Sequence, residues 1–183
     1  RVAALYNENV SRLTREIEAL RSAMALPAPA GKTKLYAEIV GYFPQESMIT
    51  VSSGASDGVW RGAAVVTGDG LVGVVSAVGP STSEVTLMGS PSLVIGGMLD
   101  RNPPVAGLIR GYSPGDVRLQ LANPRAPVQV GDRVFTSGFG IVPRGILIGR
   151  VVQVIFDEAF GRKEALILPS VEVGGLRQVV IFR

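Results

Sequence analysis

Apolar residues recur at alternating spacings of three and four along the first 26 residues, and the positions between them are nearly all polar. This 3.5-residue period is typical of a coiled-coil seam, which is narrower than the apolar face of a helix docked on a globular core. We therefore predict a helix at residues 1–26 that pairs with another chain, with packing on its own domain as the alternative. The predicted seam consists of Ala3, Tyr6, Val10, Leu13, Ile17, Leu20 and Met24.

The helical pattern ends at Pro27, and residues 27–34 are predicted to be a linker because proline cannot continue the helical hydrogen bonds. From Leu35 onward the pattern changes to short β-prone runs separated by Gly, Pro, Asp and Ser. Many short strands without a second helix indicate all-β barrels or sandwiches. The predicted strands lie near residues 35–40, 48–51, 63–67, 71–78, 84–87, 94–99, 106–112, 117–121, 133–137, 146–156, 165–168 and 178–182.

One motif occurs twice in the β region. Residues 62–67 and 73–78 match residues 131–136 and 149–154, and the second copy holds seven extra residues between its halves. We infer two small related β-barrels, with chance similarity in a Gly/Val-rich chain as the alternative. The predicted fold is mainly β with one N-terminal helix, and the barrels are expected at 35–105 and 106–183. The last strand, 178–182, either closes the second barrel or returns to the first.

The composition removes much of the catalytic repertoire, because the 183 residues include no cysteine and no histidine. A Ser-His-Asp triad, a thiolate nucleophile and a Cys- or His-ligated metal are therefore excluded. Residues 54–58 fit the G-x-S-x-G pattern of a hydrolase nucleophile elbow, and residues 68–73 fit the G-x-G-x-x-G pattern of a dinucleotide-binding loop. Both motifs require a helix directly after the turn, whereas strand patterns follow both segments here. We predict a surface turn and a β-hairpin there. We expect no cofactor, no metal and no enzymatic activity; a carboxylate-dependent hydrolase is the alternative, since glycoside hydrolysis needs only two acids.

The net charge of +3 is small, and the basic residues are scattered along the sequence, which argues against nucleic-acid binding. The longest stretches free of charge are shorter than a membrane-spanning helix requires. The sequence opens with Arg1 inside the helical pattern. We therefore expect that a preceding segment, which would carry any signal or membrane anchor, has been removed.

Residues 136–151 carry a T-S-G…P-x-G-I-x-I-G-x-V framework, and residues 49–59 and 70–75 agree with the same pattern. Together with the order helix, proline break and two barrels, this framework resembles the bacterial rod-shape-determining MreC family. One departure is visible, because Gly140-Ile141-Val142 stands where the family often has Gly-Gly and an aromatic residue. The framework residues are Thr136, Ser137, Gly138, Pro143, Gly145 and Gly149.

The resemblance implies a non-enzymatic scaffold of the cell-elongation machinery that maintains rod shape. Such proteins are anchored in the inner membrane by an N-terminal helix, form homodimers through the coiled coil, and place both barrels in the periplasm. The implied partners are the penicillin-binding transpeptidase of elongation, which builds peptidoglycan, together with RodA, MreD and MreB. Self-association into filaments is also implied. The alternatives are a carboxylate-dependent cell-wall hydrolase and a wall-binding module without protein partners.

Exposed apolar residues on turns are candidates for a partner surface, because a β-module can recruit a partner through an apolar patch or a free strand edge. The alternative is that these side chains fill the core, where most large apolar residues lie. The candidates are Trp60, Tyr112, Phe139, Ile141 and Val142.

Overall fold

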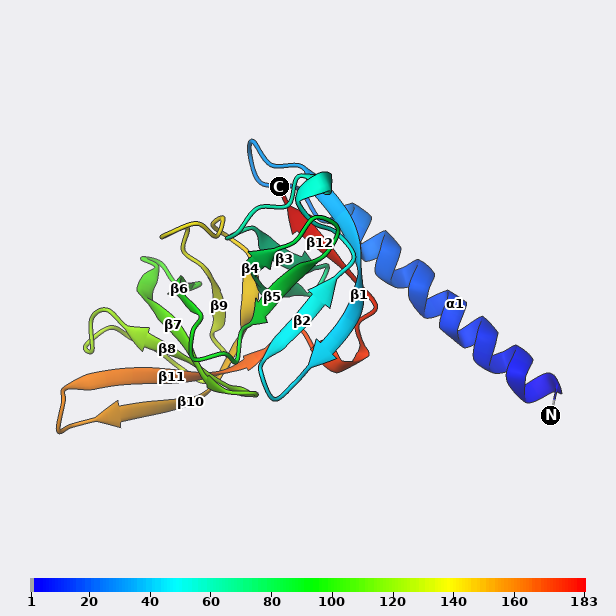
Figure 1. Ribbon diagram of the computed structural model, residues 1–183. Coiled ribbons are helices and arrows are strands. Elements are labelled where there is room, and N and C mark those ends of the chain that lie inside the picture. The colour runs from blue at the N-terminus through cyan, green and yellow to red at the C-terminus, as the bar shows by residue number, and fades with distance from the viewer. Residues whose placement is uncertain (1) are drawn as a thin grey trace.

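The computed structural model describes residues 2–183, apart from the side chains within 1–6 and 19–24. The predicted seam residues Ala3, Tyr6, Leu20 and Met24 therefore lie outside the described side chains. One long helix, α1 (Val2–Ala25), extends away from a body made of β-strands (Figure 1). The helix ends two residues before Pro27, as expected for a backbone that proline cannot continue.

Twelve strands follow within the described part of the chain, at the twelve places that the sequence predicted. The first barrel consists of β1 (Lys34–Phe43), β2 (Met48–Val51), β3 (Ala64–Thr67), β4 (Gly70–Val78), β5 (Ser83–Leu87) and β12 (Gln178–Phe182). The second barrel consists of β6 (Val94–Leu99), β7 (Val105–Ser113), β8 (Asp116–Leu121), β9 (Arg133–Thr136), β10 (Leu147–Asp157) and β11 (Arg162–Pro169). The predicted fold class is confirmed.

Alternation of side chains explains how each strand contributes to a barrel. In β8, Val117, Leu119 and Leu121 are buried, and the residues between them are half-buried. Successive side chains of a strand point to opposite faces, so one face fills the barrel and the other faces outward. A barrel closed on itself leaves no long unpaired edge, which suits a small all-β module.

The two barrels have the same strand order. The first closes as β4-β5-β2-β1-β12-β3, and the second closes as β10-β11-β8-β7-β6-β9, with neighbouring strands antiparallel. Each strand of one barrel therefore has a counterpart in the other, and β12 corresponds to β6. The chain reaches this sixth position last in the first barrel but first in the second.

The predicted domain boundary after residue 105 disagrees with this pairing. β6 pairs with β7 and β9, so residues 94–99 belong to the second barrel. β12 pairs with β1 and β3, so the last strand returns to the first barrel. The second barrel is thus an insertion between β5 and β12. The boundary was missed because a strand's apolar pattern shows that one face is buried but does not show which strands lie beside it.

The twofold motif corresponds to one supersecondary unit in each barrel. The Gly62 N–H donates a hydrogen bond to the Val75 carbonyl oxygen at 2.8 Å, and the Gly131 N–H donates to the Val151 carbonyl oxygen at the same distance. These pairs occupy equivalent positions of the two motif copies. The shared pattern supports two barrels of one design over chance similarity of sequence.

A glycine in each copy lets neighbouring strands approach closely. A Cβ atom at Gly73 would lie 2.1 Å from the Thr86 carbonyl oxygen, and one at Gly149 would lie 2.0 Å from the Leu168 carbonyl oxygen. Neither separation is possible for a real side chain. The glycines are therefore required by contact with the next strand, β5 or β11, at the same point of each barrel.

The larger of two apolar clusters joins the barrels to each other. It fills the second barrel and includes the outward-facing Ala64, Val66 and Phe182 of the first barrel. At the same junction a Cβ atom at Gly70 of β4 would lie 2.4 Å from the Leu147 carbonyl oxygen of β10. The two barrels therefore share buried apolar surface and a close approach of their backbones.

Candidate interaction surfaces

The apolar stripe of α1 is uncovered within the described side chains. Val10, Leu13 and Ile17 are 45%, 52% and 48% exposed. Arg12, Arg15 and Glu16 of the same stretch line a pocket with residues 174–178, so a polar flank of α1 faces the first barrel. The alternative that the stripe packs on its own domain therefore gains no support from the three exposed stripe residues. Among the described residues, no helix combines the length and apolar character that crossing a membrane would require.

The loop that carries the resemblance joins β9 to β10, and buried Thr136 organises it. Its hydroxyl Oγ1 donates to the Pro143 carbonyl oxygen at 2.5 Å and accepts the Ile146 N–H at 2.9 Å. The Gly145 N–H donates to the Thr136 carbonyl oxygen at 2.9 Å. The Thr136 N–H also donates to the Ile146 carbonyl oxygen at 2.9 Å, so one threonine closes a ten-residue connection through four hydrogen bonds.

The remaining framework residues also shape this loop. The Ser137 N–H donates to the Gly96 carbonyl oxygen at 3.0 Å, which ties the loop to β6. Gly138 and Gly145 adopt φ values of +81° and +89°, a region that favours glycine. The framework therefore fixes a loop conformation in which Phe139 and Ile141 face outward and Val142 faces the core.

The five candidate surface residues do not form one group. Phe139 and Ile141 are 76% and 61% exposed, so both stand at the surface as predicted. Val142 is only 5% exposed and belongs to the cluster that joins the barrels, so its assignment to the surface is wrong. The loop turns between Ile141 and Pro143, so that adjacent aliphatic side chains point in opposite directions.

Ile141 and Trp60 come together across the two barrels. A Cβ atom at Gly62 would lie 3.0 Å from Ile141 Cδ1 and 3.1 Å from Trp60 Cζ3. Trp60 is half-buried, and the Lys32 ammonium lies 4.5 Å from the centroid of its ring. The tip of the second barrel's loop therefore rests on a turn of the first barrel, beside the linker.

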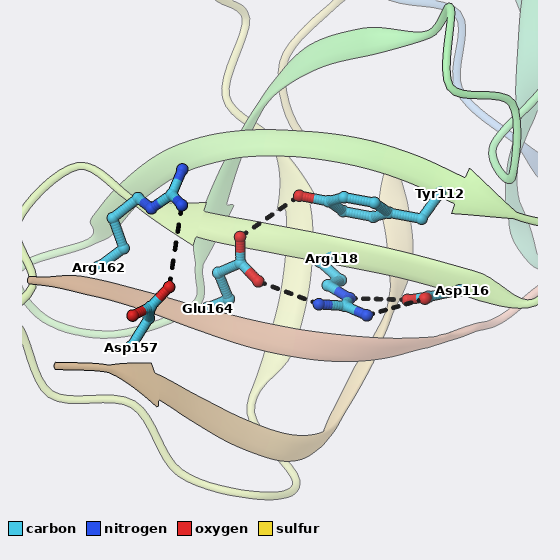
Figure 2. Close-up of polar contacts among 6 residues, drawn as sticks. All are labelled: Tyr112, Asp116, Arg118, Asp157, Arg162 and Glu164. Carbon is cyan, nitrogen blue, oxygen red and sulfur yellow. Dashed lines mark hydrogen bonds and ion pairs between the residues drawn. The ribbon is translucent and has the colours of Figure 1, made fainter. Parts of the chain in front are cut away.

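Tyr112 lies apart, in a polar cluster on β7, β8 and β11 (Figure 2). The Arg118 guanidinium lies 4.6 Å from the centroid of the Tyr112 ring. The same guanidinium makes two hydrogen bonds to Asp116, at 2.8 and 2.9 Å, and one to Glu164 at 3.2 Å. Tyr112 is 46% exposed, so it is at the surface but held by this cluster.

Electrostatics in the Tyr112 cluster favour the charged forms. The hydrogen bonds from Arg118 hold the pKa of the Asp116 carboxyl below its ordinary value of 3.8, although partial burial acts in the opposite direction. The hydrogen bond to Asp116 likewise raises the pKa of the Arg118 guanidinium. Both groups stay charged at neutral pH, so the cluster acts as a fixed ion pair.

The two motifs that resemble catalytic sequences are turns, as predicted. Ala55–Asp57 forms a single 3₁₀ turn that ends at Gly58, whose φ is +81°. An Asp57 carboxylate oxygen accepts the Gly54 N–H at 3.0 Å. Thr67 pairs with Gly70 in the β3–β4 hairpin, so the glycines of the second motif belong to a hairpin. Within the described part of the chain, no group of three or more Asp and Glu side chains is placed to hold a metal ion.

Sequence reasoning missed a cationic region beside Trp60. Lys32, Arg61, Arg144 and Arg183 are separated by up to 150 residues, so no run of basic residues could reveal their proximity. Lys32 lies over Trp60, and Arg61 is the next residue in the chain. Arg183 donates a hydrogen bond to the Asp57 carbonyl oxygen on the same turn, and Arg144 follows Ile141 in the loop.

Comparison with known proteins gives a consistent result. A family model described as "Rod shape-determining protein MreC, barrel core" matches residues 41–183. The cell shape-determining protein MreC of Cereibacter sphaeroides is 37% identical over 111 residues, which cover 60% of this chain and 37% of that protein. The MreC of Listeria monocytogenes is 29% identical over 140 residues, which cover 74% of this chain and 48% of that protein. The chain spans about half the length of these relatives or less.

Solved structures share the fold. One named MreC has a TM-score of 0.80 and 28% identity, and the match covers 98% of this chain and 99% of that chain. The major periplasmic domain from the cell shape-determining filament MreC has a TM-score of 0.73 and 21% identity, with 83% and 98% covered. MreC from a Helicobacter pylori complex with penicillin-binding protein PBP2 has a TM-score of 0.64 and 17% identity, with 81% and 98% covered.

The last two likenesses, at low identity, concern the fold alone. The family model is more specific, because it extends from β1 through β12 and so includes both barrels and their junction. On this match, which covers most of its length, the chain belongs to the family of the rod shape-determining protein MreC.

Proposed function

We propose that this chain is a non-enzymatic scaffold of the cell-elongation machinery, which dimerises through α1 and binds a peptidoglycan-synthesising transpeptidase in the periplasm. Family membership combined with the exposed stripe of α1 carries the proposal. An apolar stripe at coiled-coil spacing that its own barrels leave uncovered is stabilised when a second helix buries it. RodA, MreD and MreB are further proposed partners of the complete protein.

The engagement of the acidic side chains supports the non-enzymatic part of the proposal. Asp116 and Glu164 both bind Arg118, and Asp132 binds Arg101 through two hydrogen bonds. Asp57 is used within its own turn. Carboxylates occupied by arginines or by turn amides are not free to reach a substrate, as a general acid must. These contacts are therefore typical of carboxylates that stabilise a fold rather than of carboxylates in a hydrolase active site.

The periplasmic location and the transpeptidase partner come from the relatives. One solved structure with this fold is described as a major periplasmic domain, and another is a complex with the penicillin-binding protein PBP2. We assign the corresponding contact in this chain to the exposed loop tip at Phe139 and Ile141. An exposed aromatic side chain beside an aliphatic one is a common anchor of protein interfaces.

Dimerisation is tested by a pair of charged substitutions on the same turn of α1. Leu13→Glu places a carboxylate in the predicted seam, whereas Ser11→Glu adds the same charge at an exposed position outside it. Sedimentation equilibrium should give a dimer mass for the unmodified chain and for Ser11→Glu, but a monomer mass for Leu13→Glu. Equal masses for all three chains would refute the role of the seam.

Transpeptidase binding is tested with the purified extracytoplasmic domain of the elongation transpeptidase from the same organism. The unmodified chain should bind it in a biosensor experiment, and Phe139→Ser should weaken binding about tenfold, the loss of a typical aromatic anchor. Val130→Ser is the matched control, since Val130 is 67% exposed on another loop of the second barrel. Absence of binding by the unmodified chain would contradict the proposed partner.

A further inference from the structure

Four cationic residues belong to the segments that meet at the contact between Trp60 and Ile141. We call Lys32, Arg61, Arg144 and Arg183 the basic face. The Lys32 ammonium lies over the Trp60 ring, and Arg61 is adjacent in the chain. Backbone hydrogen bonds between Thr33 and Arg183, at 2.8 and 3.0 Å, bring the C-terminal arginine beside the linker that holds Lys32.

The fourth cation comes from the second barrel. A Cβ atom at Gly138 would lie 2.9 Å from Arg144 Cβ, so Arg144 lies across the same loop whose Ile141 side chain approaches Gly62. The basic face therefore draws its charges from the linker, a turn of the first barrel, a loop of the second barrel and the end of β12. Only the folded arrangement of both barrels produces it.

The charges of the basic face are not neutralised by ion pairs. In the second barrel Arg101, Arg118, Arg133 and Arg162 each pair with a carboxylate. Within the part of the chain that the structure describes, no ion pair involves any of the four cations of the basic face. Asp57, the nearby acid, already accepts the Gly54 N–H through its carboxylate.

Apolar side chains lie next to these charges. Phe139 and Ile141 are 76% and 61% exposed, and Trp60 is half-buried beneath Lys32. Arginine and aromatic residues are enriched at the centres of protein interfaces, where a few anchors supply most of the binding energy. Arginine also matches carboxylates in geometry, because its planar fork can donate two parallel hydrogen bonds. This composition fits a protein surface that bears carboxylates around an apolar contact.

We propose that the basic face binds an acidic surface of a partner protein, with Phe139 and Ile141 in the apolar centre and the cations around it. The inference rests on the proposed function, in which that partner is the elongation transpeptidase. Complementary charges would steer the encounter and select the partner, whereas the apolar tip would hold it. Because both barrels contribute residues to the basic face, binding would also depend on how the two barrels are positioned relative to each other.

Charge reversal tests the proposal in the transpeptidase binding experiment. Arg61→Glu/Arg144→Glu should weaken binding about tenfold or more, because each change replaces an attraction by a repulsion. Arg110→Glu/Arg125→Glu is the matched control, since both arginines are exposed, lie outside the basic face and form no ion pair among the described residues. The control should retain the unmodified affinity. Arg61→Lys/Arg144→Lys should lose much less affinity than the Glu variant.

Salt provides a second readout. Affinity of the unmodified chain should fall as salt rises from about 50 to about 300 mM, because screening weakens attraction between exposed charges. The Glu variant should show little or no such fall. Circular dichroism should show the same fold in all variants, since the substituted side chains are exposed.

The outcomes separate this inference from the proposed function. If the unmodified chain and the Glu variant bind the transpeptidase equally well, the basic face is not the docking surface, although the transpeptidase is still a partner. If the unmodified chain does not bind, both proposals fail. Loss of cosedimentation with peptidoglycan sacculi in the Glu variant, with transpeptidase binding unchanged, would overturn the inference in favour of an anionic glycan.

Discussion

The two barrels have the same strand order but differ in how the chain builds and connects them. The first is made of residues on both sides of the second, whereas the second is one continuous segment from β6 to β11. Two residues join β3 to β4, but ten join the equivalent β9 and β10. Five ion pairs lie in the second barrel. The two barrels therefore share the strand order that closes a barrel, whereas the loops and charges on their surfaces differ.

The largest expected effect comes from removing β12. Val179, Val180, Ile181 and Phe182 are each at most 2% exposed, so truncation after residue 177 removes four buried side chains of the first barrel, including Phe182 at the junction with the second. At about 2 kcal/mol for each buried side chain, the loss is comparable to the whole stability of a small domain. Hydrogen exchange should show lost protection in β1–β5 and retained protection in β7, β8 and β11. Equal loss in both barrels would show that they fold only together.

Substitution of the paired glycines should affect both barrels similarly. Gly73→Ala and Gly149→Ala each place a Cβ atom about 2 Å from a backbone oxygen of the next strand. We expect each to lower the free energy of unfolding by about 3 kcal/mol, as for overpacking against a backbone that must shift. Gly175→Ala is the control, because nothing lies within 4 Å of its added Cβ and its φ is not positive. Denaturant unfolding measures all three; a neutral Gly73→Ala beside a costly Gly149→Ala would break the equivalence.

Because the β9–β10 loop is longer than the β3–β4 turn, Thr136 should contribute more to stability than Thr67, its counterpart in the first barrel. Thr136→Val leaves the Ile146 N–H and the Pro143 carbonyl oxygen without their side-chain partner, at a cost of about 2 kcal/mol. Thr67 occupies the matching position, but its hydroxyl only accepts the Asp69 N–H at 3.2 Å in a two-residue turn. Thr67→Val should therefore cost about 0.5–1 kcal/mol. Urea midpoints compare the two variants, and equal costs would contradict the special role of the long loop.

The smallest effect concerns the ion pairs of the second barrel. The folded-state pKa of Asp116 lies below 3.8, so its pairing with Arg118 stabilises the fold above that pH and is lost as the pH falls below it. The pair is about one-third exposed, so Asp116→Asn should reduce stability at pH 7 by less than about 1 kcal/mol. The difference between the two chains should shrink toward pH 2 in thermal unfolding.

The positions of the strands could be predicted closely, because short runs of β-prone residues ended by Gly, Pro or Asp depend on local sequence. Met48–Val51 and Val94–Leu99 agree with the prediction at both ends. The twofold motif also indicated the common design, since Gly73 and Gly149 are fixed by the same close contact. The assignment of β6 to the first barrel failed, because partner choice is a long-range property.

The candidate surface was predictable only in part. Phe139 and Ile141 are exposed as expected, but their neighbour Val142 is buried between the barrels. Apolar character is the same for all three side chains, so only the path of the loop decides which one reaches the core. The basic face gave no sequence signal, since Lys32 and Arg183 meet only because β12 returns to β1.

The sequence by itself determined the elements of this protein: a helix with an apolar seam, a proline that ends it, twelve strands and two related β-units. It also excluded chemistry that requires cysteine or histidine. These features depend on residue periodicity and local backbone preference, which act over a few residues. Only the tertiary structure decided that the second barrel is inserted into the first and that four distant cations share one face. Those results depend on pairing across as many as 150 residues, where many partners are compatible with one pattern and burial of the shared core selects among them.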